Sequence, residues 1–243
     1  MAFTGEALPW QEALRQARER MAQAGQGDEV APAPLAGCVL VSLIGRGRPA
    51  QASDPGVAPS GPAETSRAPA PSHSGYVLTT YRFPGEAGGP AVLVSSSFFG
   101  AALLRWLQQT GRPVGRWVVM GTAHSTWAAV LEGAVDPAQA SQDPNVESQS
   151  RHLRQASEAG AVTQADLDRW AECLRRYIGG LDLRLCLVGA GDTEASQQAI
   201  WKTLWESIPE RAFVILDITH GFRHQPVITA FMLTLLQWLR GFR

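Results

Sequence analysis

Residues 37–48 read GCVLVSLIGRGR, an unbroken apolar run closed by alternating glycine and arginine. The run is short enough for a single strand, and apolar side chains on both sides of a strand are typical of a parallel sheet covered by helices on both faces. The Gly-Arg-Gly-Arg loop would lie at the carboxyl end of that strand. This stretch therefore predicts the first strand of an α/β sheet, followed by a loop at the edge where such sheets bind ligands.

The chain beyond residue 90 alternates apolar strands with amphipathic helices. We expect strands at 117–120, 183–188 and 212–218, and helices at 98–109, 124–132, 165–177, 193–208 and 225–239, the last of them largely buried. The polar stretch 136–149 separates the strand and helices predicted before it from those predicted after it. Residues 76–83 and 91–94 flank a Gly-rich turn and predict a β-hairpin at the sheet edge. The pattern predicts a Rossmann-like, doubly wound, mainly parallel sheet with flanking helices.

Two stretches lie outside this alternation. Residues 1–36 contain a predicted amphipathic helix over 9–23, with Trp10, Leu14, Ala17 and Met21 at helical spacing, and then a linker. Residues 49–75 are rich in Pro, Ala, Ser and Gly, cannot offset their ordering entropy by burial, and predict a disordered insertion. We therefore expect an N-terminal helix and linker over 1–36 and one Rossmann-like domain over 37–243.

Composition narrows the classes of function. A formal net charge of -1 gives no basis for broad nonspecific nucleic-acid binding, so a basic site must be local. The three cysteines form no CxxC pair and are odd in number, which favours a reducing cytoplasm over a disulfide framework. No segment reaches the roughly 20 apolar residues of a membrane span. We expect a cytoplasmic protein with no membrane segment, metal site or cofactor.

Two of the loops that follow predicted strands carry candidate ligand-binding residues. Gly45, Arg46 and Gly47 combine close backbone approach with a guanidinium that pairs with phosphate, although a solvated turn explains them equally well. In loop 121–126, Thr122 and Ser125 could receive an anion or a ribose. Helix capping explains the same hydroxyls and is the favoured interpretation of that loop alone.

The third loop, 217–226, reads DITHGFRHQP and is the most polar of the three. Asp217 or Thr219 could satisfy turn amides, which would be a structural role. His220 and Gly221 lie beside Arg223, however, and a glycine next to a phosphate-pairing cation again favours an anion site. We favour a functional role for this loop.

The sequence Asp217-Ile-Thr-His-Gly-Phe-Arg223 resembles the Asp-x-Thr-x-Gly-x-Lys/Arg signature of CARF domains in type III CRISPR ancillary proteins. Further motifs are similar in order to one subfamily of these proteins, and together they cover most of residues 37–240: Ser42-Leu-Ile-Gly45, the strand 76–83, Ser97-Phe-Phe-Gly100 and Met120-Gly-Thr-x-x-Ser-x-Trp127. The resemblance implies a two-fold symmetric homodimer that binds cyclic tetra- or hexa-adenylate in a shared pocket.

The resemblance also implies roles for individual residues. Each protomer would supply the same Arg46, Thr122 and Arg223 to equivalent nucleotides. Thr122, Ser125, Thr219 and His220 are candidates for ribose hydroxyl and base-edge contacts. Family members commonly continue into a HEPN ribonuclease domain, for which this chain has no room after Arg243. We therefore expect this chain to be the sensor portion, which controls a ribonuclease effector that is either fused to it in the full-length protein or encoded separately.

Two enzyme classes remain as alternatives. The same pocket could belong to a ring nuclease that opens the cyclic ligand without a metal, by positioning the ribose 2′-hydroxyl and stabilising the developing charge. A dinucleotide-dependent Rossmann enzyme is the weaker alternative. Gly45-Arg-Gly-Arg-Pro49 lacks the third glycine of the GxGxxG turn and runs into the predicted insertion where that motif opens a helix.

Overall fold

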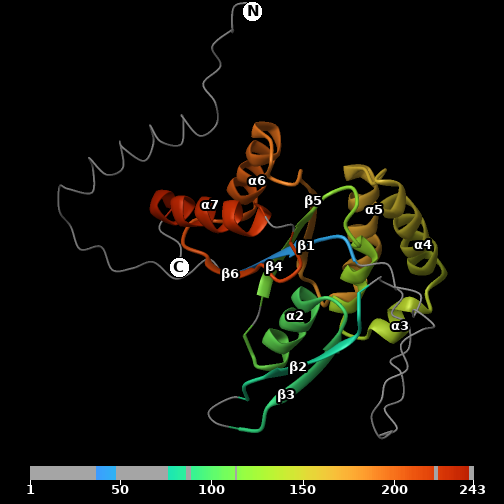
Figure 1. The fold of residues 1–243 in the computed structure, drawn as a ribbon. Helices are drawn as coiled ribbons and strands as arrows, with labels where there is room; N and C mark the ends of the chain where they lie inside the picture. The colour runs from blue at the N-terminus through green and yellow to red at the C-terminus, as the bar shows by residue number, and fades with distance from the viewer. Residues whose placement is uncertain (1–36, 48–75, 86–88, 113, 222–223, 241–243) are drawn as a thin grey trace, which may run out of the picture.

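The computed structural model describes residues 37–47, 76–85, 89–112, 114–221 and 224–240, and the predicted helix at 9–23 and the insertion at 49–75 lie outside them. Strands β1 (Cys38–Ile44), β4 (Val114–Gly121), β5 (Asp182–Leu187) and β6 (Phe213–Asp217) form a four-stranded parallel sheet in the order β5-β4-β1-β6 (Figure 1). Helices cover both faces of this sheet. The predicted Rossmann-like α/β fold class is confirmed.

The two faces of the sheet follow from the alternation of side chains along each strand. In β1, Leu40 and Ile44 join one buried cluster, whereas Val39, Val41 and Leu43 join the other. The first cluster lies against α2 (Phe99–Gln109), α4 (Pro144–Ala159) and α5 (Gln164–Leu174), and the second against α6 (Glu194–Ser207) and α7 (His224–Arg240). Figure 1 shows α6 and α7 on one side of the sheet and α4 and α5 on the other. Burial on both faces explains why β1 is an unbroken apolar run.

The strand order fixes where a ligand site is expected. The chain runs from β1 outward to β4 and β5, and then crosses to β6 on the opposite side of β1. The sheet therefore reverses its winding between β1 and β6, and open α/β sheets bind ligands at the carboxyl ends of the strands near such a switch point. Ser42 pairs with Asp217 and Ile44 with Gly121, so the carboxyl ends of β1, β4 and β6 share one edge.

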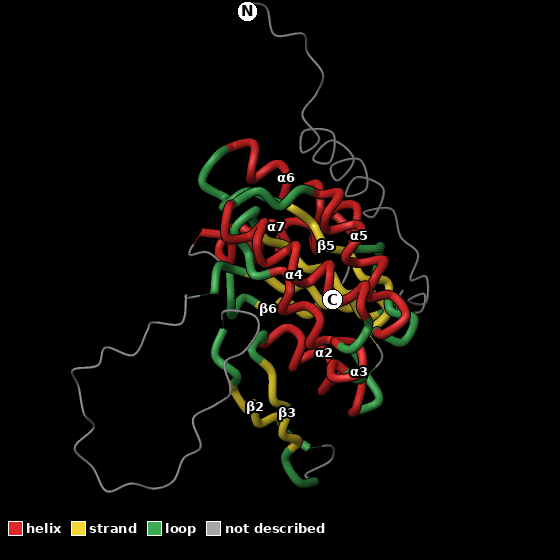
Figure 2. The backbone as a smooth tube through the Cα atoms, turned by 90° about the vertical axis from the view of Figure 1, so that its right-hand side faces the viewer, coloured by secondary structure: helices red, strands yellow, loops and turns green. Residues whose placement is uncertain are grey.

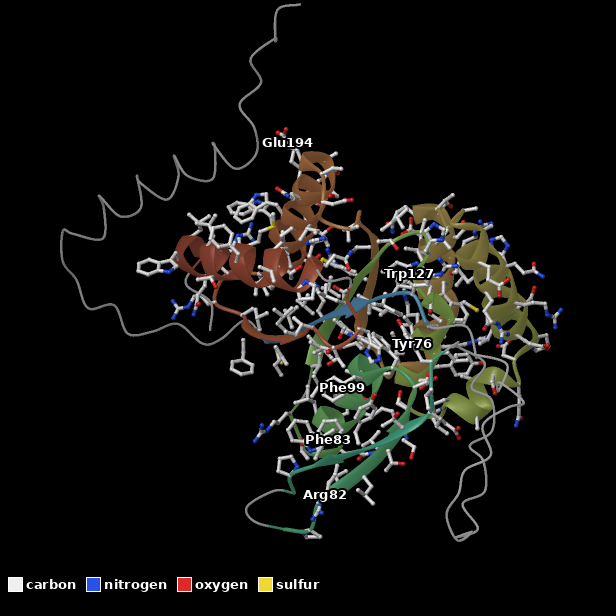
Figure 3. The ribbon with its side chains drawn as sticks, viewed as in Figure 1. Tyr76, Arg82, Phe83, Phe99, Trp127 and Glu194 are labelled. Carbon is white, nitrogen blue, oxygen red and sulfur yellow. The ribbon has the colours of Figure 1, made fainter. Side chains whose placement is uncertain are left out.

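The predicted hairpin forms, as β2 (Thr79–Phe83) and β3 (Val92–Ser96), but it makes a two-stranded sheet of its own and does not extend the edge of the parallel sheet. Its buried residues Phe83 and Val94 pack on Ala102 of α2, and the Phe83 ring stacks on Trp106 with centroids 5.0 Å apart. Phe83 and the α2 residue Phe99 are labelled in Figure 3. Figure 2 shows the hairpin extending from the main body next to α2. The hairpin therefore packs on α2 and does not pair with an edge strand of the parallel sheet.

The region between β4 and α5 differs most from expectation. The helix expected at 124–132 is a 3-10 helix, η2 (Trp127–Gly133). The polar stretch 136–149 was expected only to separate two halves, yet it contains α3 (Pro137–Ser141) and the start of α4. Asp136 and Asp143 cap these helices by accepting hydrogen bonds from Gln139 N and Asn145 N, and a proline follows each cap.

The other predicted helices and strands agree with the structure apart from their ends. Helix α5 passes into a short 3-10 helix, η3 (Arg175–Tyr177), and Thr193 caps α6 with a reciprocal bond to Ser196. Helix α7 was expected to be largely buried, but one of its faces is exposed. No helix in the described ranges is long and apolar enough to cross a membrane.

Candidate ligand site

The loops after β1, β4 and β6 lie in direct contact at the carboxyl edge of the sheet. A Cβ atom placed on Gly45 would stand 2.1 Å from the carbonyl oxygen of His220, so only glycine allows these two backbones to approach so closely. The amide of Thr126 donates to the Gly45 carbonyl at 3.0 Å, and the Ser125 hydroxyl donates to the Ile44 carbonyl at 2.7 Å. The three loops predicted from sequence therefore form one cluster.

Tyr76 contacts the loops after β1 and β6; it was expected only as part of the strand 76–83, and it lies just before β2. Its hydroxyl donates to the Gly45 carbonyl at 2.6 Å and accepts from the Gly45 amide at 3.1 Å, while its ring centroid lies 4.7 Å from that of His220 (Tyr76 is labelled in Figure 3). Burial raises the pKa of Tyr76 well above its usual value. The phenol therefore stays neutral and can serve as both donor and acceptor.

Asp217 shapes the third loop from a buried position. The carboxylate is 2 % exposed, and Oδ1 accepts from the Thr219 amide at 2.9 Å, which is the turn-stabilising role that the sequence left open. Oδ2 is buried near the Ser42 hydroxyl without completing a hydrogen bond to any described residue. Burial outweighs these polar neighbours and raises the pKa of Asp217.

His220 lies between aromatic side chains next to this carboxylate. Its ring centroid is 5.6 Å from that of Phe98 in an edge-on arrangement, in addition to its contact with Tyr76. Burial lowers the pKa of His220, although Asp217 and Glu132 favour the charged form. The imidazole is therefore neutral at pH 7, and its Nδ1 finds no hydrogen-bond partner within the described ranges.

The loop after β4 uses its two candidate hydroxyls differently. Ser125 is fully buried, and besides its bond to the Ile44 carbonyl it accepts from the Thr122 amide at 2.8 Å, so it holds the turn in shape. Thr122 is only half-buried and lines a cavity of about 510 Å³ at the carboxyl ends of β4 and β5. The other lining residues are mostly apolar: Ala123, His124, Leu187, Val188, Gly189 and Ala190.

The loop Gly189-Ala-Gly-Asp192 forms part of this cavity wall; it precedes the helix predicted at 193–208 and was not among the candidate residues. The structure holds the loop by side-chain amides of Gln225 and Gln197, which donate to the carbonyls of Gly189 at 2.8 Å and Gly191 at 3.0 Å. A Gly-rich turn between a strand and a helix at the shared carboxyl edge was the signal that could have placed it in the site.

The turn between β3 and α2 is held in place by Glu132, which no local sequence pattern marks as part of the site. Its carboxylate accepts from the Ser96 hydroxyl and the Ser97 amide, each at 2.6 Å, and also from the Ser97 hydroxyl. At the start of α2, a Cβ on Gly100 would lie 2.5 Å from Ser42 Oγ and 2.9 Å from Asp217 Oδ2. The motif Ser97 to Gly100 thus lets α2 pack tightly behind the loop cluster.

The candidate residues divide into exposed and buried groups. Arg46 and Thr219 are exposed and Gly47, Thr122, His220 and Gly221 are half-buried, whereas Gly45, Ser125 and Asp217 are buried. Arg223 lies outside the described residues. Direct contacts with a ligand are therefore open to the first six, and the buried three shape the loops. Among the described residues, no group of three or more His, Cys, Asp and Glu side chains could hold a metal ion.

Fold and site together define a doubly wound α/β protein with a loop cluster at its topological switch point. No protein family model, curated protein or solved structure matches the chain.

Proposed function

We propose that this chain is a sensor that binds a cyclic oligoadenylate at the loop cluster and thereby controls a ribonuclease effector in cytoplasmic CRISPR antiviral defence. The observation that carries the proposal is the contact between the Gly45 and His220 backbones, which draws two loops of the motifs that resemble CARF domains into one site at the switch point. The carboxyl edge of an open α/β sheet is where nucleotide ligands bind.

The exposed groups of the cluster match the chemistry of a cyclic RNA ligand. Arg46 is exposed beside two glycines and can pair with a phosphate. Thr219 is exposed and Thr122 is half-buried, so their hydroxyls can reach a ribose 2′-hydroxyl. The apolar cavity next to Thr122 can accept a flat adenine against Leu187 and Val188.

A homodimer completes the proposed site. A cyclic tetra- or hexa-adenylate has internal symmetry, and a two-fold dimer would offer it the same loops from both protomers. Each protomer then contacts half of the ring. The exposed position of Arg46 at the open edge of the sheet is compatible with a ligand shared in this way.

Isothermal titration calorimetry with cyclic tetra- and hexa-adenylate tests the proposal, with linear tetra-adenylate as the ligand control. We expect saturable binding of one cyclic ligand per two chains. Arg46→Ala and Arg223→Ala should each weaken it by about 10- to 150-fold, because a charge-assisted hydrogen bond contributes about 1.5–3 kcal/mol. Arg151→Ala, on the exposed surface of α4, is the matched control. Absence of heat from both cyclic ligands with folded protein would contradict the proposal.

The neutral state of His220 favours a second candidate, a metal-independent ring nuclease. An unprotonated imidazole can accept the proton of a 2′-hydroxyl whose oxygen attacks the adjacent phosphorus. The P–O5′ bond then breaks, which leaves a 2′,3′-cyclic phosphate on one side and a 5′-oxygen that takes a proton from water on the other, provided that the site holds the attacking and leaving oxygens in line. Chromatography of cyclic ligand after long incubation with excess protein should then show linear products, fewer with His220→Phe. Ligand that stays cyclic would exclude this candidate and leave the sensor proposal standing.

A further inference from the structure

Helix α7 is apolar on two opposite faces, and the described structure covers only one of them. Leu233, Leu236 and Leu239 are buried against the sheet and α6. On the other side, Val227 is 71 % exposed, Phe231 70 % and Trp238 80 %. With Thr234, these residues recur at intervals of four, three and four positions, so they form one stripe along the helix. We call Val227, Phe231, Thr234 and Trp238 the α7 stripe.

A groove between α6 and α7 adjoins this stripe. It has a volume of about 220 Å³, and its apolar walls are Trp201 of α6 and Phe231, Met232 and Leu235 of α7. Glu194, at the start of α6 and labelled in Figure 3, lies at its rim. Helix α7 carries no Asp, Glu, Lys or Arg before Arg240. A stripe and a groove that are both apolar and side by side form a surface of the kind that is normally covered.

The N-terminal part of the chain enters the fold on the same side as the end of α7. The Phe213 amide donates to the Gly37 carbonyl at 2.9 Å, so residue 37 adjoins the start of β6. The last residues of α7 reach the same side, because Arg240 donates to the carbonyl of Ile208, a few residues before β6. Residue 37, where the N-terminal segment joins the fold, therefore lies at the same edge of the sheet as the C-terminal end of α7.

Its sequence matches the stripe in spacing. Trp10, Leu14, Ala17 and Met21 follow one another at four, three and four residues, the same intervals as in the α7 stripe. Two helices with this spacing can pack their apolar faces along each other. Charged residues such as Glu12 and Glu19 fall on the opposite side of the predicted helix and would remain in water.

The connecting chain is long enough for this contact. Residues 22–36 can span up to roughly 50 Å when extended, at about 3.3 Å per residue. Helix α7, with 17 residues, is only about 25 Å long. We propose that residues 10–21 pack as a helix on the α7 stripe and the adjoining groove of the same chain, as an intramolecular cover for this face.

Hydrogen exchange measured by mass spectrometry on the full chain tests this proposal. We expect the amides of residues 10–21 to exchange at least tenfold more slowly than in an unstructured peptide. Leu14→Asp, Phe231→Asp and Trp238→Asp should each restore rapid exchange there. Gln16→Asp, on the opposite side of the predicted helix, and Leu93→Asp, at an exposed apolar position of β3, are matched controls that should preserve slow exchange.

Three outcomes would overturn the proposal. Rapid exchange of residues 10–21 in the unmodified chain would show that the segment is not packed. Slow exchange that survives both Phe231→Asp and Trp238→Asp, in variants that melt like the unmodified chain, would place the segment elsewhere. Slow exchange that is lost on dilution would show that the α7 stripe is covered by a second copy of the chain.

Discussion

Replacing Gly45 by alanine would force apart the two loops whose contact defines the candidate site. The new methyl group would stand 2.1 Å from the His220 carbonyl oxygen, a backbone atom that cannot rotate away. That carbonyl would have to withdraw by about 1 Å to reach the closest contacts that real Cβ atoms make. The movement would strain the bonds of Gly45 to Tyr76 and Thr126, which have lengths of 2.6 to 3.1 Å.

The expected loss of stability is about 2–3 kcal/mol, the upper part of the range for overpacked interiors, because backbone and hydrogen bonds must shift together. In a domain of this size, each kcal/mol lowers the melting temperature by about 2–4 °C, so Gly45→Ala should melt about 4–12 °C below the unmodified chain. Cyclic oligoadenylate binding should weaken as well, since the loops that present Arg46 and Thr219 are displaced.

Differential scanning calorimetry would measure this shift, with Gly115→Ala as the matched control. A Cβ on Gly115 meets only the Cys38 carbonyl, at an ordinary 3.8 Å, so that variant should stay within about 0.5 kcal/mol of the unmodified chain. If Gly45→Ala and Gly115→Ala melted at the same temperature, the loops after β1 and β6 would not be in close contact. The candidate site, which is defined by that contact, would then be refuted.

Three further predictions concern carboxylates. Glu132→Gln should cost about 1–2 kcal/mol in urea unfolding, because the charge-assisted bonds from Ser96 and Ser97 become neutral ones; an equal effect of the exposed Glu158→Gln would contradict this role. Asp217→Asn should gain stability relative to the unmodified chain as pH rises above the unfolded pKa of about 3.9, because burial raises the folded-state pKa of Asp217 and the folded state loses stability as pH rises through that pKa. A difference in unfolding free energy that is constant with pH would refute this. The hydrogen bond from Thr163 lowers the pKa of Asp166, so this carboxylate stabilises the fold above the unfolded pKa of about 3.9 and ceases to do so as pH falls below it. Asp166→Asn should therefore lose less stability than the unmodified chain on acidification below about pH 5. An unchanged dependence of the unfolding free energy on pH would count against this.

The fold and the meeting of the three loops could be predicted because both depend on local patterns and general rules. The run from Val39 to Ile44 is apolar on both sides, which indicates a strand covered on two faces. Once parallel strands are expected, their carboxyl ends must share an edge, so the loops after Ile44, Gly121 and Asp217 are brought together by topology.

The contacts that shape the site could not be predicted, because they join residues far apart in the sequence. Nothing local indicates that Tyr76 would bond to Gly45, or that Glu132 would accept from Ser97. The first pair joins the segment before β2 to the loop after β1, and the second joins η2 to the turn before α2. Side-chain identity alone does not determine such packing.

Two helices show how an apolar pattern can mislead. The buried face of α4 alternates Val146 and Leu153 with Ser150 and Ser157, so its apolar residues alone show little helical periodicity. The cap Asp143-Pro was the stronger signal for α4, as Asp136-Pro was for α3. Helix α7 is apolar on both sides, and the pattern alone could not distinguish a buried helix from one with an exposed stripe.

Hydrogen exchange with and without saturating cyclic tetra- or hexa-adenylate is the most direct test of the proposed sensor site. Ligand should slow the exchange of amides in residues 45–47, 122–126 and 218–221, the three loops at the carboxyl edge, and leave the β2–β3 hairpin unchanged. Slowed exchange confined to other regions, or no slowing with either ligand, would contradict the placement of a cyclic oligoadenylate at this switch point.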